Sequence, residues 1–172
     1  MTSYKEKLNN ISTFIFDVDG VLTDGSVILY KEEVVRTLNS RDGYALQFAA
    51  RSGYRIFIIT GGYSESVKER LTGLGATEVC LKSSNKIKVY EDLKSKYGFS
   101  DDEVLYMGDD IPDYQVMGQV HVATCPQNAA VEIKHISHYQ SPIDGGKGCV
   151  RDVIEQTMRV QGKWFTESAF EW

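Results

Sequence analysis

Short apolar runs alternate along the chain with longer stretches in which apolar residues recur at helical spacing. The runs predict strands at 12–16, 54–60, 77–81 and 103–108, and weaker strands at 120–124 and 135–140. The longer stretches predict helices at 43–53, 65–75, 86–98, 128–133 and 148–162. This alternation favours a doubly wound α/β fold, in which a parallel sheet is covered by helices on both faces.

Turn and cap residues add detail to this pattern. Asp42 is expected to cap the helix that starts at 43, and Ser64 the helix that starts at 65. Two β-rich runs flank the polar turn Lys31-Glu32-Glu33, which predicts a β-hairpin inserted after the first strand. We expect one domain over residues 1–172, with the hairpin at about 25–39 and a tail at about 163–172.

Composition and charge exclude several classes of protein. The 172 residues are 42% hydrophobic and 25% charged, with a formal net charge of -5 and no block of Lys and Arg. We therefore expect neither nucleic acid nor a membrane as a partner. No apolar run approaches the roughly 20 residues of a membrane span. The polar N-terminus has no signal-peptide core, and three scattered cysteines indicate ordinary thiols, so a cytoplasmic location is expected.

Carboxylates gather after two of the predicted strands. Asp17 and Asp19 follow the first strand, and Asp109 and Asp110 follow the strand at 103–108, with Asp113 one helical turn later. In parallel sheets these strand ends meet at one edge, where ligands bind. Close carboxylates repel by about 4 kcal/mol per pair at an effective dielectric near 20. A hard cation such as Mg²⁺ removes that cost and favours phosphate substrates.

The same carboxylates have chemistry of their own. One can act as a nucleophile that forms an acyl phosphate, while a second acts as general acid and base. A single aspartate after a strand is usually a turn or cap residue. The combination of two acidic clusters at equivalent places in an α/β pattern is what indicates an active site.

The motifs "DVDGVLTDG", "ITGG", an isolated Lys86 and "GDDIPD" occur in this order and resemble those of the haloacid dehalogenase superfamily of phosphotransferases. The segments 39–44, 67–75 and 145–153 resemble the branch of 3-deoxy-D-manno-octulosonate 8-phosphate (KDO 8-phosphate) phosphatases and their nonulosonate relatives. The resemblance covers about residues 11–163. It implies a Rossmann-like fold, dependence on Mg²⁺, a homotetramer and a role in KDO and lipopolysaccharide biosynthesis.

The resemblance also implies roles for single residues. Asp17 would be the nucleophile and Asp19 the general acid and base, while Thr60 would bind the phosphoryl group and Lys86 would neutralise charge. The implied ligands of Mg²⁺ are Asp17, the Asp19 carbonyl, Asp109 and Asp110. The implied substrate-binding residues are Ser40, Asp42, Gly43, Gly61, Arg70 and Lys147.

One position departs from the family pattern. The residue after "TG" is typically Arg in KDO 8-phosphate enzymes and Glu in nonulosonate enzymes, but here it is Gly62. A side chain expected to help choose the sugar acid is therefore missing, and a phosphatase for a nonulosonate 9-phosphate stays open as an alternative.

No cap domain is expected, because the segments between the motifs hold only a hairpin and single helices and strands. A capless site is either open to large substrates or covered by another subunit. The hairpin is apolar and would be marginal alone, so we expect it to pair with copies of itself in a homotetramer.

Two other classes of protein share parts of this pattern. A phospho-acceptor signalling domain also uses acidic residues, Mg²⁺, Thr and Lys, but there the acidic pair comes first and the Lys last, whereas Lys86 precedes the second acidic cluster. A non-catalytic protein would not require the intact set of aspartates. The three histidines complete no zinc pattern, and the aromatic tail has no clear period.

Overall fold

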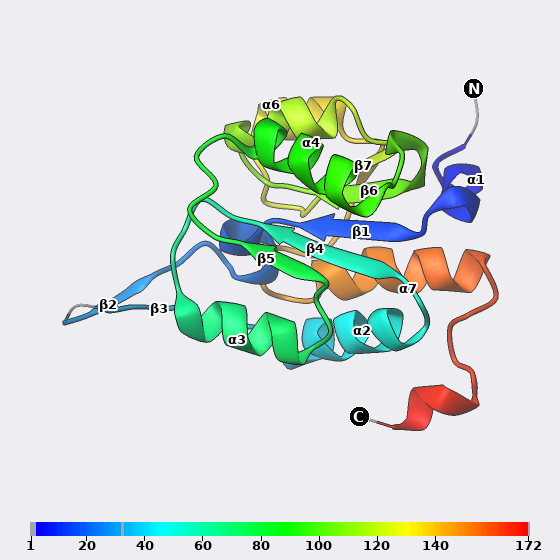
Figure 1. The fold of residues 1–172 in the computed structure, drawn as a ribbon, viewed down its shortest axis with the longest axis horizontal. Helices are drawn as coiled ribbons and strands as arrows, with labels where there is room; N and C mark the ends of the chain where they lie inside the picture. The colour runs from blue at the N-terminus through cyan, green and yellow to red at the C-terminus, as the bar shows by residue number, and fades with distance from the viewer. Residues whose placement is uncertain (1–2, 32, 172) are drawn as a thin grey trace.

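The structure, a computed structural model, describes residues 3–31 and 33–171. Its centre is a six-stranded sheet in the order β5-β4-β1-β6-β7-β8, in which every neighbouring pair is parallel (Figure 1). The strands are β1 (Thr13–Phe16), β4 (Arg55–Ile59), β5 (Glu78–Cys80), β6 (Val104–Met107), β7 (Val122–Cys125) and β8 (Tyr139–Gln140). Most residues of the central strands are apolar and buried, because both faces of the sheet are covered.

Helices cover the two faces in separate sets (Figure 1). One face carries α2 (Ser40–Arg51), α3 (Glu65–Gly73) and α7 (Cys149–Val160). The other carries α4 (Lys86–Tyr97), α5 (Tyr114–Met117) and α6 (Val131–Ile136). Alternate residues of β1 serve the two cores: Phe14 and Phe16 pack toward the first set, and Ile15 packs toward the second. The expected doubly wound α/β fold is confirmed, and no described helix is both long and apolar enough to cross a membrane.

Short elements complete the chain. These are the N-terminal α1 (Tyr4–Lys7), the irregular turn Val18–Leu22, which is kinked at Asp19 and Gly20, and the 3₁₀ segments Leu8–Asn10, Asp101–Glu103, Ile111–Asp113 and Glu167–Phe170. The turn Val18–Leu22 begins directly after Asp17, and the segment Ile111–Asp113 begins directly after Asp110. Both short turns therefore lie where the candidate carboxylates were predicted.

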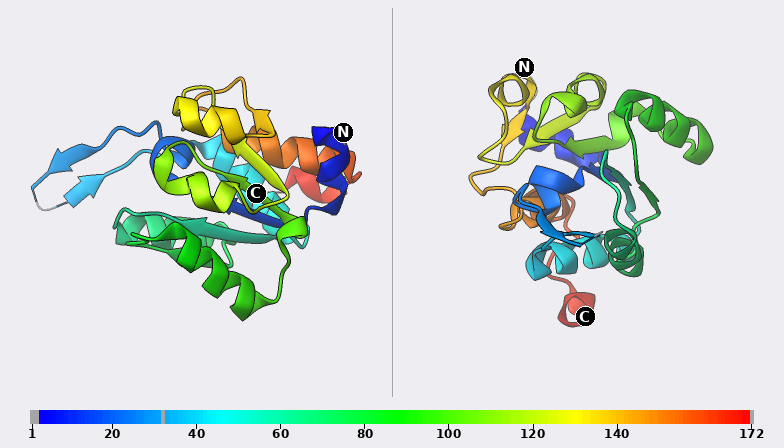
Figure 2. Two further views of the ribbon diagram at one scale, coloured as in Figure 1. Left: turned by 90° about the horizontal axis from the view of Figure 1, so that it is seen from above. Right: turned by 90° about the vertical axis from the view of Figure 1, so that its left-hand side faces the viewer.

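The predicted hairpin is present as β2 (Ile28–Tyr30) and β3 (Glu33–Val35), which pair antiparallel. It extends away from the body of the molecule (Figure 2). Lys31 has a positive φ of 54°, as a tight turn requires, while Glu32 of the predicted turn lies outside the described residues. The aliphatic side chains of the hairpin are exposed, with Leu29 at 77% and Ile28 at 56%.

The predicted cap of α2 was wrong. The helix begins at Ser40, three residues earlier than the pattern indicated, and Asn39 is the N-cap, because its side chain accepts a hydrogen bond of 2.8 Å from the Arg41 amide. Asp42 is buried and instead accepts a hydrogen bond of 2.7 Å from the Arg151 amide in the first turn of α7. The carboxylate therefore serves a neighbouring helix that lies 109 positions away in the sequence.

Two other predictions at the end of the chain needed correction or completion. His135 and Ile136 belong to α6, and only Tyr139–Gln140 forms the edge strand predicted at 135–140. In the tail, Trp164 packs edge-on against Tyr44 and Phe48 of α2. Trp172 lies outside the described residues.

Candidate active site

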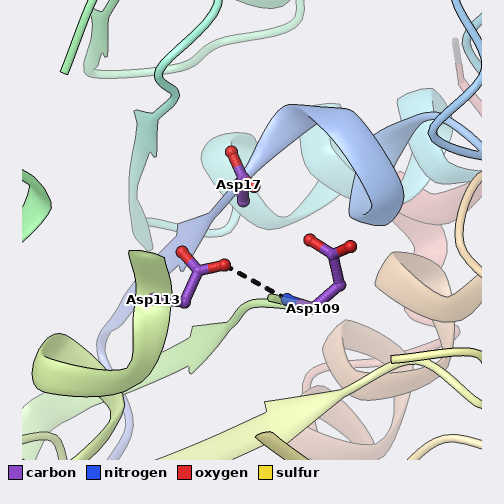
Figure 3. A group of neighbouring side chains, drawn as sticks. All are labelled: Asp17, Asp109 and Asp113. Atoms are coloured by element: carbon purple, nitrogen blue, oxygen red, sulfur yellow. Dashed lines mark hydrogen bonds between the residues drawn. The ribbon is translucent and has the colours of Figure 1, made fainter. Parts of the chain in front are cut away.

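The site lies beyond the carboxyl ends of β1, β4 and β6, the three central strands of the sheet. Asp17 follows β1, Thr60 follows β4 and Asp109 follows β6. Figure 3 shows Asp17, Asp109 and Asp113 gathered around one small space, with Asp17 and Asp109 coming from different strands. The sheet therefore brings together the two acidic clusters that the sequence placed at separate strand ends.

Asp17 is held on both of its carboxylate oxygens. Oδ1 accepts a hydrogen bond of 2.7 Å from the Val18 amide, and Oδ2 lies 3.0 Å from the Nζ of Lys86. Lys86 begins α4, and its long side chain is buried as it reaches the strand end. The contact places the predicted neutralising charge directly on the predicted nucleophile.

Asp113 anchors the same lysine, a role that the sequence did not assign. Its Oδ1 lies 2.7 Å from the Nζ of Lys86 and accepts a hydrogen bond of 2.5 Å from the Tyr106 hydroxyl. Its Oδ2 accepts from the backbone amides of Asp109 and Asp110, at 3.2 and 3.5 Å. The only sequence signal was its position in "GDDIPD", one turn after the acidic pair.

Burial and mutual repulsion raise the pKa of two carboxyls in the cluster. Burial, then the charge of Asp113, raise the pKa of Asp17 to about 6, although Lys86 opposes the shift. Burial, then the charges of Asp17 and Asp113, raise the pKa of Asp109 to about 7. The cluster therefore carries more negative charge than one lysine balances, which is the condition that favours a cation.

The donor set fits a hard metal ion. Oxygens of Asp17, Asp109 and Asp113 lie within 4.8 Å of one another. Each oxygen of Asp113 already contacts two protein donors, and each oxygen of Asp17 contacts one, whereas the buried Oδ1 of Asp109 has no hydrogen-bond partner in the described chain. Asp17 and Asp109 are therefore the carboxylates available to Mg²⁺, and Asp113 holds the lysine. The Asp110 carboxylate is exposed and accepts from the Ile111 amide at 2.8 Å.

Close backbone approach fixes the loop that carries Asp17. Gly20 has a φ of +90°, and a Cβ there would lie 2.0 Å from an Asp109 carboxylate oxygen. Gly145 comes from the segment before α7, and a Cβ there would lie 1.9 Å from the Gly20 carbonyl oxygen. The segment 144–148 therefore packs directly on the loop that follows Asp17, and its Lys147 lies 3.6 Å from Asp24.

The other predicted residues lie in different places. Thr60 is buried, and its Oγ1 accepts a hydrogen bond of 3.2 Å from the Gly62 amide, while Gly61 is exposed beside it. Ser40, Gly43 and Arg70 line one small cavity of about 90 Å³ on the α2–α3 side. None of the aspartates of the cluster lines that cavity. Substrate contact by Ser40, Asp42, Gly43, Gly61, Arg70 and Lys147 stays a prediction.

Asp19 has a partner that the sequence did not reveal. Arg36, which directly follows β3, lies 2.6 Å from Asp19 through its Nε and 2.9 Å through its Nη2. Arg36 belongs to none of the motifs, and a lone basic residue after a hairpin gives no signal in the sequence.

Comparison with known proteins agrees with this geometry. A family model described as haloacid dehalogenase-like hydrolase matches residues 63–148. The 3-deoxy-D-manno-octulosonate 8-phosphate phosphatase of Escherichia coli strain K12 is 35% identical over 91% of this chain and 84% of its own length. The enzyme of that name from Yersinia pestis is 32% identical over 92% of this chain and 85% of its own length.

The chain belongs to the haloacid dehalogenase-like hydrolases. Among solved structures of this family, the 3-deoxy-D-manno-octulosonate 8-phosphate phosphatase of Moraxella catarrhalis is similar with a TM-score of 0.91 and 30% identity. The alignment covers 97% of this chain and 95% of that one, which was solved with a magnesium ion, a phosphate ion and KDO. A cobalt-bound relative from Haemophilus influenzae has a TM-score of 0.89 and 27% identity, and the alignment covers 95% of this chain and 98% of the relative.

Family membership gives the acidic cluster a chemical context. Members of the family have been solved with Mg²⁺ and with Co²⁺, and in this chain the unpartnered Asp109 oxygen beside Asp17 meets the requirement for such an ion. No histidine or cysteine of the described chain joins the cluster, so its ligands are oxygens, as a hard cation prefers.

Proposed function

We propose that this protein is a Mg²⁺-dependent phosphatase that hydrolyses KDO 8-phosphate. The observation that carries the proposal is the buried contact between Asp17 and Lys86 at the carboxyl end of β1, beside the free oxygen of Asp109. This arrangement offers a nucleophile, a fixed positive charge and a cation site within one small space. The extent of the similarity to curated phosphatases for this substrate supports the same reaction.

In the proposed reaction, a carboxylate oxygen of Asp17 attacks phosphorus as the bond from phosphorus to the sugar oxygen breaks. Asp19 gives a proton to the departing sugar oxygen, which leaves an aspartyl phosphate on Asp17. Water then attacks this phosphate and gives a proton back to Asp19, so that Asp17 and inorganic phosphate are released. Mg²⁺ held by Asp17 and Asp109 would offset the negative charge of the phosphoryl group.

Other side chains of the site stabilise the same charge. Lys86 keeps Asp17 ionised and offsets part of the repulsion between the carboxylate and a phosphate dianion. Asp113 and Tyr106 keep the lysine in this position. Thr60, at the end of β4, is the proposed hydrogen-bond donor to the phosphoryl oxygens.

We infer that the active form is a homotetramer of single-domain subunits, assembled through the hairpin. The exposed aliphatic side chains of β2 and β3 support this inference, because an isolated two-stranded hairpin with such a surface would be marginal in water. A cytoplasmic location is supported by three cysteines, Cys80, Cys125 and Cys149, that are all free thiols.

Phosphate release from synthetic substrates tests the proposal. The protein should release phosphate from KDO 8-phosphate in the presence of Mg²⁺ with a higher kcat/KM than from a nonulosonate 9-phosphate. The comparison is needed because Gly62 lacks the arginine of the typical KDO 8-phosphate enzyme. Preference for the nonulosonate would assign that substrate instead, and a phosphorylated protein without turnover would indicate a signalling domain.

A further inference from the structure

The guanidinium of Arg36 makes a bidentate contact with Asp19, the predicted acid–base residue. Its Nε lies 2.6 Å from Oδ1 of Asp19 and its Nη2 lies 2.9 Å from Oδ2. This fork geometry makes the strongest and most directional pairing that arginine forms with a carboxylate. The side chain of Arg36 is only 7% exposed, whereas that of Asp19 is 33% exposed, so the carboxylate stays accessible to a ligand.

The contact depends on the glycine at position 62. A Cβ built on Gly62 would lie 2.9 Å from Nη2 of Arg36 and 3.1 Å from Oδ2 of Asp19. The guanidinium therefore occupies the space where a side chain at 62 would begin. Position 62 has no side chain, but a basic group, the guanidinium of Arg36 at the end of the hairpin, lies in the same space.

The pairing also limits Asp19. Arg36 contacts both of its oxygens, so the carboxylate cannot turn toward a departing sugar oxygen while the contact persists. A substrate that offers Arg36 another anion would release the carboxylate. A planar carboxylate matches the arginine fork in the same two-pronged way as Asp19 does.

There is room for such a substrate beside Arg36. A hollow of about 580 Å³ is lined by Arg36, by Val34 and Val35 of the hairpin, and by residues 63–66. This volume is within the usual range for small-molecule sites. Lys82 lies with its Nζ 4.3 Å from the centre of the Tyr63 ring, which brings a second positive charge to the rim.

We propose that Arg36 is the specificity-determining residue of this site. When the sugar acid is bound, Arg36 binds its carboxylate, and when no substrate is bound, Arg36 pairs with Asp19. The proposal rests on the proposed function, since it concerns the non-phosphate end of that substrate. It predicts that an anionic sugar acid is favoured over a phosphate ester of similar reactivity without a carboxylate.

Paired substrates and variants test the proposal. For the wild type, Arg36→Met and Arg36→Lys, kcat/KM is measured for KDO 8-phosphate and for para-nitrophenyl phosphate, which has no carboxylate. We expect Arg36→Met to lower the ratio of the two values by about 30-fold or more, mainly through KM for the sugar phosphate. Arg36→Lys keeps the charge but loses the fork, so its ratio should fall less.

Arg159→Met is the matched control. Arg159 contacts Glu155 through the same two nitrogens, at 2.9 Å through Nε and 2.7 Å through Nη2, but both reach one oxygen, on the exposed side of α7. This control should leave the ratio within about twofold of the wild type, as exposed ion pairs contribute little. An equal loss on both substrates in Arg36→Met would overturn the proposal, because Arg36 would then only orient Asp19. An unchanged ratio would also overturn it.

Binding without turnover separates this proposal from the proposed function. Calorimetry with KDO and with its uncharged methyl ester measures recognition of the carboxylate directly. The wild type should bind KDO about tenfold or more tightly than the ester, and Arg36→Met should lose the difference. Absence of phosphate release would defeat the proposed function while this readout still stands. Equal binding of acid and ester by the wild type, or no binding of either, would defeat the role of Arg36.

Discussion

At the scale of single residues, the site is a set of buried charges in which one lysine contacts two carboxylates. Burial disfavours the charge of Lys86, but Asp17 and Asp113 outweigh that effect and hold the pKa of Lys86 above its usual value. Two carboxylates at 3.0 and 2.7 Å therefore share one ammonium group. Loss of Lys86 leaves two carboxylates uncompensated in a buried place, so it is expected to affect both stability and chemistry. Loss of Asp17 leaves Lys86 paired with Asp113, so it is expected to affect chemistry alone.

Replacement of Asp17 by Asn should abolish turnover and leave the fold intact. The amide cannot form an aspartyl phosphate, so kcat for KDO 8-phosphate should fall below about a hundredth of the wild-type value. Steady-state phosphate release gives the rate, and circular dichroism gives the fold. The exposed Asp102→Asn serves as control and should keep full activity. A rate above that limit would show that Asp17 is not the nucleophile.

Replacement of Lys86 by Met should destabilise the protein and inactivate it. The change leaves Asp17 and Asp113 buried without their cation, and breaking a buried ion pair in this way costs about 3–5 kcal/mol of unfolding free energy. Urea denaturation measures the loss. Lys88→Met in the same helix removes an exposed lysine and should change stability by less than about 0.5 kcal/mol. Equal stability of the two variants would contradict the assigned role of Lys86.

At the scale of elements, two contacts connect parts of the chain that the sequence keeps apart. The hairpin presents apolar side chains on both of its faces to solvent, although its strands pair only with each other. In the body of the molecule, Asp42 on α2 accepts a hydrogen bond from the Arg151 amide at the start of α7. The exposed hairpin is a surface on which a partner subunit could pack. The hydrogen bond of Asp42 connects α2 and α7, two helices on one face of the sheet.

Replacement of Ile28 and Val34 by Asp should dissociate the proposed tetramer. Each buried aliphatic side chain contributes about 1.5–3 kcal/mol to association, and the two residues lie on opposite faces of the hairpin. Light scattering measures the mass. The control is Val131→Asp, which alters a side chain 61% exposed at the start of α6 and should leave the mass unchanged. A wild-type monomer with full activity on KDO 8-phosphate would refute the assembly.

Replacement of Asp42 by Asn should flatten the dependence of stability on pH. Burial raises the pKa of Asp42 from 3.8 to about 6, so the folded state favours the neutral acid. The wild type should therefore lose roughly 2–3 kcal/mol relative to the variant as the pH rises from about 4 to about 7. Urea denaturation at several pH values gives the two curves. The exposed Asp92→Asn should follow the wild type, and parallel curves for Asp42→Asn would contradict the prediction.

At the scale of the whole molecule, the sheet gathers more negative charge at its carboxyl edge than Lys86 neutralises. Asp17, Asp109 and Asp113 come from two separate parts of the chain and meet only because β1 and β6 are neighbours in the sheet. The fold thus stores electrostatic repulsion at one edge, and a bound cation relieves it.

Removal of divalent metal should therefore affect activity and stability together. Excess chelator should abolish phosphate release, Mg²⁺ should restore it, and Ca²⁺ should substitute poorly because its coordination shell is larger and looser. A few degrees of Mg²⁺-induced rise in Tm is expected for the wild type, by the mass-action effect of a ligand that binds only the folded state. Asp109→Asn should reduce that rise. Full activity in excess chelator would refute the cation site.

The sequence by itself determined the class of fold and indicated most residues of the candidate site. Buried parallel strands are largely apolar on both faces, so they can be recognised in the sequence as apolar runs, as at 54–60. Asp17 and Lys86 could be predicted as site residues because strand-end carboxylates and the order of the motifs are local properties of the chain. The weaker runs near the sheet edge were less legible, since the short strand β8 carries little apolar pattern and His135 and Ile136 joined α6 instead.

Only the tertiary structure decided which groups meet. Asp113 reaches Lys86 across 27 positions, Arg36 reaches Asp19 across 17, and Asp42 reaches α7 across 109. Polar contacts of this kind depend on the direction and depth of a side chain after the elements have packed, and no local pattern encodes either quantity. The sequence showed that position 62 lacks a side chain, whereas the fold showed that Arg36 fills the space, because strand pairing and helix packing set the distance between them.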